Sequence, residues 1–281
     1  MTGQGDPWDV PEWHALRREA ALTRHLLASG VTAVGKANYA DQFGEYYTAF
    51  FGLSVGIERL AKLIFVADHA MANAGLMPSE RRIREFGHRL QDLVAAADRV
   101  AVAREARLRY PRPTSAITSE ILGCLDAFAD ASRGRYANFR SLEDPARESH
   151  EPIRRWWDVV ATAILNIHYN GTLTQARVDS NASIAHAAIS QFSSVLYINE
   201  SGAPMRDVFT ASVRTGQARI VQKYGRYYTL LLVRWLAELY SVLAEQACHE
   251  HGIVAFFGSS ELFWTFTVED RFLRTRKQWP L

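Results

Sequence analysis

The sequence EYYTAFFGLSVGIERLAKLIFVADH, residues 45–69, decides the fold class. Its apolar residues recur every three or four positions, which places them on one face of a helix. They are Phe50, Leu53, Ile57, Leu60, Ala61, Ile64 and Phe65. On the more polar side, Glu58 and Lys62 are four residues apart in the order that favours an ion pair within a helix. We interpret these two residues as a structural pair.

A second helix is predicted after a break at residues 74–78. Pro78-Ser79-Glu80 has the composition of a helix start. The apolar stripe that follows predicts one continuous helix through Phe86, Leu90, Leu93, Val94 and Ala97.

Most of the remaining chain also has helical periodicity. Helices are predicted at residues 10–27, ending at Ser29-Gly30, and at residues 114–128, 154–167, 204–213 and 216–249. Residues 176–196 favour a helix, although Val195–Ile198 before the turn residues Asn199–Gly202 also suits a short strand. Gly44, Gly52 and Gly56 have the spacing of closely packed helices rather than of a phosphate-binding loop. The fold class is therefore predicted to be all-α.

The composition limits the classes of protein to which the chain can belong. With 281 residues, 48% of them hydrophobic, the chain can build one large helical domain or two packed halves. A net charge of +2 gives no overall signal for a polyanion partner. The two cysteines, Cys124 and Cys248, are far apart, which favours a reducing compartment. Residues 227–243 are interrupted by charges, and a bilayer span needs about 20 apolar residues. We therefore expect a soluble cytoplasmic protein with no membrane contact.

Three fragments of the chain together resemble the HEPN superfamily, the helical nucleotide- and RNA-binding domain of prokaryotic toxin–antitoxin and antiphage defence proteins. The first is the Ile-Glu-x-x-x-Lys-Leu-Ile helix that contains Glu58 and Lys62. The second is Gly-His88-x-Leu-x-x-Leu, and the third is the Arg-Tyr segment at residues 132–139. The resemblance covers about residues 40–170. It implies a HEPN-like helical bundle over 40–170, preceded by an N-terminal helix at 1–39 and followed by a C-terminal helical extension at 171–281.

The resemblance also implies the candidate site residues. Active members place an arginine and a histidine about two turns apart on one helix, where the histidine can move a proton of the 2′-OH and the arginine can stabilise phosphorane charge. Arg82 and His88 have this spacing, as do Arg18 and His25, but neither pair lies on the later helix where the family places it. The position of His88 after Gly87 favours a structural role instead, in which the ring bonds to backbone groups or to Glu58.

The Arg-Tyr segment is the predicted RNA-binding and phosphate-binding element. Arg133, Arg135, Tyr136 and Asn138 combine cations, an aromatic face and an amide. The alternative is an ordinary loop in which Tyr136 is anchored in the core. No metal site and no cofactor are expected, because His249 and His251 diverge on a helix and no nucleotide-binding motif is present.

Two functions follow as hypotheses from the resemblance. The first is a protein that binds or cleaves RNA without a metal, in a bacterial defence or toxin–antitoxin context. The second is a non-catalytic helical scaffold, with the aromatic block at residues 256–266 as its docking surface. The expected partners are RNA and either a second copy, through the aromatic residues 46–51 of the first bundle, or another protein of the defence system.

Overall fold

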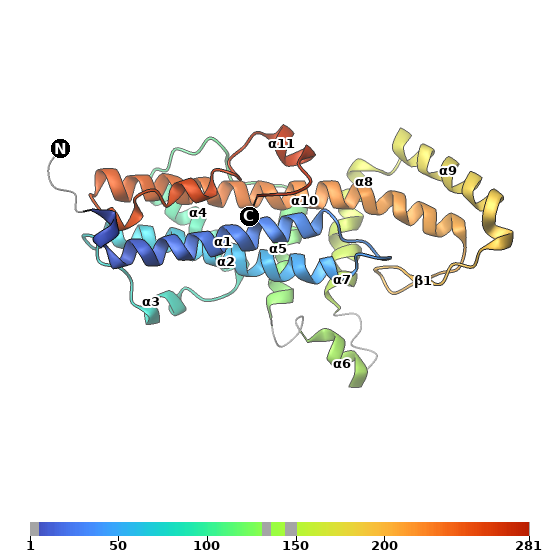
Figure 1. Ribbon diagram of the computed structural model, residues 1–281, viewed down its shortest axis with the longest axis horizontal. Coiled ribbons are helices and arrows are strands. Elements are labelled where there is room, and N and C mark those ends of the chain that lie inside the picture. The colour runs from blue at the N-terminus through green and yellow to red at the C-terminus, as the bar shows by residue number, and fades with distance from the viewer. Residues whose placement is uncertain (1–5, 131–135, 144–150, 281) are drawn as a thin grey trace. The chain divides into compact units, whose positions relative to one another are not determined.

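The computed structural model describes residues 6–130, 136–143 and 151–280, and these residues form an all-α structure, as the sequence predicted (Figure 1). In the described part of the chain the only strands are a short hairpin. The helices and strands are α1 (Pro11–Val34), α2 (Gly44–Ala72), α3 (Glu80–Glu85), α4 (Leu90–Ala103), α5 (Ala116–Ala129), α6 (Ala137–Glu143), α7 (Pro152–Arg155), α8 (Thr162–His168), α9 (Leu173–Ile189), β1 (Tyr197–Ile198), β2 (Pro204–Met205), α10 (Val208–Glu245) and α11 (Asp270–Thr275). Two π-helical turns, Trp156–Ala161 and Gln246–Glu250, precede α8 and follow α10.

The chain divides into two compact units, each assembled from separate stretches of sequence. Unit 1 comprises residues 1–30, 51–114 and 230–281, and unit 2 comprises residues 31–50 and 115–229. Helices α1, α2 and α10 therefore each contribute one part to each unit. The boundaries after residues 39 and 170 stay a prediction from the sequence.

In unit 1, α1 and α2 approach closely at glycines of α2. A Cβ atom on Gly52 would lie 2.8 Å from the Leu26 carbonyl oxygen, and one on Gly56 would lie 2.8 Å from a methyl of Leu27. The predicted role in close helix packing is thus confirmed at Gly52 and Gly56. It is wrong at Gly44, where a Cβ would meet no atom within 4 Å. Helix α1 also does not end at Gly30 but continues to Val34, since Gly30 packs against Leu53.

Replacing Gly52 with alanine is expected to lower the free energy of unfolding by about 1–2 kcal/mol. The added methyl must push back the α1 backbone, which outweighs the better helix propensity of alanine. Urea unfolding of the full chain measures the change. Gly44→Ala is the matched control, because its methyl enters open space, and it should leave stability nearly unchanged. Equal effects from the two substitutions would contradict the close approach.

Unit 2 has an aromatic core. The Phe50 ring centroid lies 5.5 Å from that of Phe128 and 5.6 Å from that of Trp156, and all three side chains are fully buried. Tyr46 is buried in the same unit. Two of the four aromatic residues on which the predicted dimer rests are therefore used inside the chain, while Phe51 is 44% exposed. The dimer through the first bundle stays a prediction.

The segment after α9 was predicted wrongly. The helix ends at Ile189, a 3-10 turn spans Ser190–Phe192, and the chain enters strand β1, which was the alternative for residues 195–198. Residues 204–205 form β2 rather than the start of a helix. The reason is turn chemistry, because the Asn199 side chain accepts bonds from the backbone of Ser201 and Ala203 and Gly202 takes a positive φ of 80°.

The C-terminal aromatic block belongs mainly to the core of unit 1. Phe256, Phe263 and Phe266 are 1% exposed or less, whereas Phe257 and Trp264 are about half exposed. A docking surface made of the whole block is therefore excluded. Both cysteines are buried, and neither forms a disulfide. No helix in the described ranges combines the length and apolarity needed to cross a bilayer.

Candidate functional site

The loop that carries His88 separates two helices that the sequence predicted to be one. Helix α3 ends at Glu85 and α4 begins at Leu90. Gly87 has a φ of 81°, a value that glycine adopts readily and that does not continue a right-handed helix. The predicted continuous helix is therefore wrong, and Arg82 and His88 do not share a helix face.

Glu58 is the centre of a three-residue cluster in unit 1. Its Oε1 atom lies 2.8 Å from Lys62 Nζ and 2.9 Å from His88 Nδ1. Both interactions were predicted, the first from the four-residue spacing and the second as the structural alternative for His88. The side chains of Glu58 and Lys62 are 22% and 15% exposed, whereas that of His88 is 73% exposed. The cluster thus has a partly covered carboxylate–ammonium pair with an imidazole on the outside.

This arrangement orients one ring nitrogen of His88. When Nδ1 carries the proton, it donates to Glu58, and the tautomer leaves the lone pair on Nε2. A carboxylate that accepts a hydrogen bond from one nitrogen of a histidine fixes the orientation and the tautomer of the ring. The same contact also fastens the residue 86–89 loop to α2. The cluster can therefore act in one of two ways. Either His88 transfers a proton at Nε2, or its contact with Glu58 serves only to hold the loop on α2.

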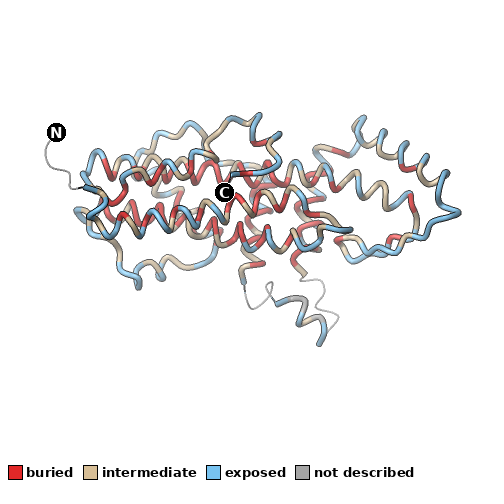
Figure 2. Tube along the Cα trace, viewed as in Figure 1, coloured by how far each residue is buried: buried red, intermediate tan, exposed pale blue. Residues whose placement is uncertain are grey.

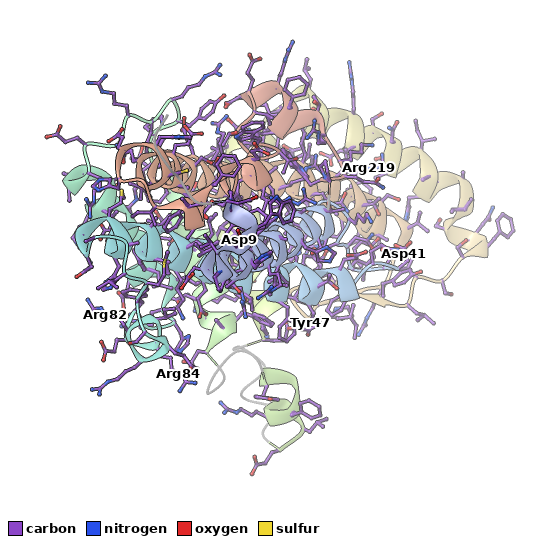
Figure 3. All side chains as sticks on the ribbon, turned by 60° about the vertical axis from the view of Figure 1, so that its left-hand side comes forward. Asp9, Asp41, Tyr47, Arg82, Arg84 and Arg219 are labelled. Carbon is purple, nitrogen blue, oxygen red and sulfur yellow. The ribbon has the colours of Figure 1, made fainter. Side chains whose placement is uncertain are left out.

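Arg82 is not directed to His88. Its guanidinium lies 3.2 Å from Glu85 and 5.5 Å from the centre of the Phe86 ring. Arg82 and Arg84 extend outward from α3, as their labels in Figure 3 show. Arg82 therefore adds positive charge to this part of unit 1, but His88 does not fix the position of its guanidinium.

The second Arg and His pair has the geometry that the first lacks. Arg18 and His25 lie on the continuous helix α1 and are both exposed. Residues seven apart are close to two full turns apart, so both side chains lie on one face. This pair keeps the spacing of a helical Arg and His site and is the second place to test.

The Arg-Tyr segment lies in unit 2. Arg133 and Arg135 are outside the described residues, and Asn138 lies in α6 with a side chain that is also outside them. Tyr136 is 52% exposed, so its predicted alternative role as an anchor in the core is wrong. Phe139 is 70% exposed, and the two ring centroids are 6.5 Å apart. These residues present two neighbouring aromatic faces to solvent.

No family model, curated protein or solved structure matches this chain. The resemblance to HEPN proteins stays a prediction that rests on Glu58, Lys62, His88 and the Arg-Tyr segment.

A buried polar cluster in unit 2 was missed by the sequence analysis. The Glu200 side chain is fully buried, with Oε1 accepting a bond of 3.2 Å from the Tyr46 hydroxyl and Oε2 lying 3.0 Å from Arg214 Nε. The Trp157 indole donates to the Tyr46 oxygen at 2.8 Å, and the Arg214 guanidinium lies 3.9 Å from the centre of the Trp157 ring. The contacts join the β1–β2 turn to α2, α10 and the first π-helical turn.

Burial dominates the electrostatics of this cluster. It raises the pKa of Glu200, and the nearby Arg214 charge opposes that rise only in part. Burial likewise lowers the pKa of Arg214 and raises that of the Tyr46 hydroxyl well above its ordinary range. The signal in the sequence was weak, since Tyr46 and Glu200 are 154 residues apart. We interpret the cluster as a set of buried contacts that holds the β1–β2 hairpin against α2 and α10.

A small polar pocket of about 290 Å³ lies in unit 2 between the loop before α2 and α10. The Tyr39 hydroxyl lies 3.0 Å from the Thr215 hydroxyl, and Gln222 donates to two backbone carbonyls of the loop. Asp41 and Arg219, both labelled in Figure 3, add one charge of each sign to the lining. Tyr39, Thr215 and Gln222 therefore hold the loop on the helix. The described residues include no group of three His, Cys, Asp or Glu side chains placed to hold a metal ion.

Proposed function

We propose that the protein binds single-stranded RNA and cleaves it with His88 as the proton-transfer group. The observation that carries the proposal is the 2.9 Å contact between His88 Nδ1 and Glu58 on an imidazole that is 73% exposed. It combines a fixed ring orientation with access for a substrate. The bacterial defence or toxin–antitoxin context belongs to the same proposal and rests on the resemblance to HEPN proteins.

The proposed reaction is an internal transfer at one phosphodiester. His88 Nε2 removes the proton of the 2′-OH, the 2′-oxygen bonds to the adjacent phosphorus, and the bond from phosphorus to the 5′-oxygen breaks. The imidazolium then returns the proton to the 5′-oxygen, which leaves a 2′,3′-cyclic phosphate and a 5′-hydroxyl. Glu58 stabilises the imidazolium. The cations of the neighbourhood, Lys62 and Arg82, offset the negative charge that develops on the non-bridging oxygens of the phosphorane.

The exposed aromatic pair supports the binding part of the proposal. Unpaired bases stack on exposed aromatic side chains, with about 1–3 kcal/mol per base. Tyr136 and Phe139 are such side chains, and the adjacent Arg133 and Arg135 provide cations for the phosphates.

Replacing Tyr136 and Phe139 together with alanine is expected to weaken binding of a single-stranded RNA by about 10–100-fold. The loss comes from one or two stacked bases. Fluorescence anisotropy with a labelled RNA of mixed sequence, at several salt concentrations, measures it. Trp264→Ala is the matched control, because Trp264 is a similarly exposed aromatic residue, at 57%, in unit 1. Equal losses in both variants would count against a stacking site on α6.

A specific observation favours the second candidate, a non-catalytic helical scaffold. Lys62 and His88 meet the same carboxylate oxygen, and Arg82 pairs with Glu85, so each of these side chains already has a structural partner. In a scaffold these contacts serve only to hold the residue 86–89 loop. If the wild-type protein neither binds nor cuts RNA, the ribonuclease proposal is lost and the scaffold stands. A nuclease or nucleotidyltransferase encoded by a neighbouring gene would then indicate its partner.

A further inference from the structure

Residues 180–199 contain no Asp, Glu, Lys or Arg, although such residues make up 22% of the chain. A charge-free stretch of this length is ordinary in a buried helix. Here the stretch is exposed. The tube over the last turns of α9 and the segment that follows is almost entirely pale blue in Figure 2, and between residues 180 and 199 only Ala182 is buried.

The exposed residues are large and apolar. We define the 189–198 surface by Ile189, Phe192, Leu196 and Ile198, which are exposed by 46%, 81%, 92% and 64%. A fully exposed residue of this size has about 200–250 Å² of surface, so the four leave roughly 600 Å² in solvent. The largest apolar patch on a typical monomer is about 300–600 Å² and is often functional.

The hairpin register shows which way part of this surface faces. Tyr197 pairs with Met205, which is buried, whereas Ile198 pairs with Pro204, which is exposed. Because side chains alternate along a strand, Tyr197 lies on the same face as Met205, and Ile198 lies on the opposite face. This outer face contains Ile198 and Pro204, and Leu196, the exposed residue before β1, precedes it; none of the three is charged.

We propose that the 189–198 surface is the docking site for a second copy of this chain. RNA needs cations for its phosphates, and an anionic membrane needs them for its headgroups, but the surface has none. A partner must therefore present a neutral apolar face. The same surface on a second copy presents one, and a two-fold contact brings together no like charges. An area of roughly 600 Å² per copy, or about 1,200 Å² in total, is also at the lower end of the range for stable protein complexes.

This proposal is independent of the RNA-cleavage proposal. It also places the contact in residues 189–198, not in the aromatic residues 46–51 of α2. Dimer formation and RNA chemistry are measured separately, so failure of one leaves the other in place.

The first test is cross-linking through an introduced cysteine. Both native cysteines are buried, so a maleimide reagent reacts mainly at a new exposed thiol. Leu196→Cys with a short bis-maleimide should give a covalent dimer. Val102→Cys, at a similarly exposed position of α4 in unit 1, should not. Cross-linking at neither position, or equally at both, would overturn the proposal.

The second test is sedimentation velocity of the full chain from about 1 to about 100 μM. Wild type should dimerise within this range, and Leu196→Asp should weaken the dimer at least tenfold, because burying a carboxylate in an apolar contact is costly. Val102→Asp should leave the dimer unchanged. A wild type that stays monomeric at about 100 μM, or a dimer insensitive to Leu196→Asp, refutes the proposal. So does binding to neutral lipid vesicles by a monomer.

Discussion

Replacing His88 with alanine is expected to lower the rate of RNA cleavage by about 10²–10⁴-fold while RNA affinity changes little. A group that moves protons in the transition state contributes to rate rather than to ground-state binding. Single-turnover cleavage of a labelled RNA, with affinity measured on the same samples, separates the two quantities. His25→Ala is the matched control, since His25 is also exposed and also follows an arginine at the family spacing.

The scaffold gives the opposite pattern for the same variant. There, His88→Ala removes one hydrogen bond to Glu58 and mainly lowers the melting temperature, as expected for a loss of about 1 kcal/mol. Glu58→Gln adds a second readout. It keeps a side chain that can accept from Nδ1 but removes the charge that stabilises the imidazolium, so a catalytic pair predicts slower cleavage with unchanged affinity. Loss of cleavage in His25→Ala alone would move the catalytic site to α1.

The helical fold was predictable from the sequence because helical periodicity depends only on residues that are close together in the chain. The stripe from Phe50 to Phe65 repeats at the helical period, and α10 carries the longest such pattern; both are helices in the structure. The failures share a physical cause. A single glycine in the left-handed region at Gly87 ends one helix and starts another, and the side chain of Asn199 forms a turn inside an apolar run. In both places the backbone conformation or the hydrogen bonds of a single residue decide the local structure, and the apolar periodicity does not.

The candidate site was predictable only where its contacts are local or come from the resemblance. The four-residue spacing gave the Glu58–Lys62 pair, and the contact of His88 with Glu58 was one of two roles considered. The Glu200 cluster could not be found in this way. Its residues come from four separate stretches of chain. A single glutamate in a hairpin turn is usually exposed, so the sequence alone does not indicate that Glu200 is buried.

That buried cluster carries the largest expected effect on stability. Replacing Arg214 with methionine should lower the free energy of unfolding by about 3–5 kcal/mol near neutral pH, because Glu200 is then buried without its counter-charge. Denaturant unfolding of the full chain measures the loss. The double variant Arg214→Met, Glu200→Gln is the control, since it removes both charges and should be considerably more stable than Arg214→Met alone.

The pH dependence of the Arg214→Met variant tests the assignment to Glu200. In wild type, burial already raises the pKa of this carboxyl above its ordinary value of 4.5, and loss of Arg214 removes a charge that opposes the rise. A raised pKa means that the folded chain binds the proton more tightly than the unfolded chain does. The contribution of Glu200 to stability is therefore fully present below about pH 4.5 and is lost as pH rises through the folded pKa. Measured against wild type at each pH, the deficit of Arg214→Met should be smaller near pH 5 than near pH 7. In the double variant, where no carboxyl remains at position 200, the deficit should not grow between pH 5 and pH 7. A deficit of Arg214→Met that is the same at both pH values would show that the loss comes from packing of the arginine on Trp157 rather than from an uncompensated buried charge.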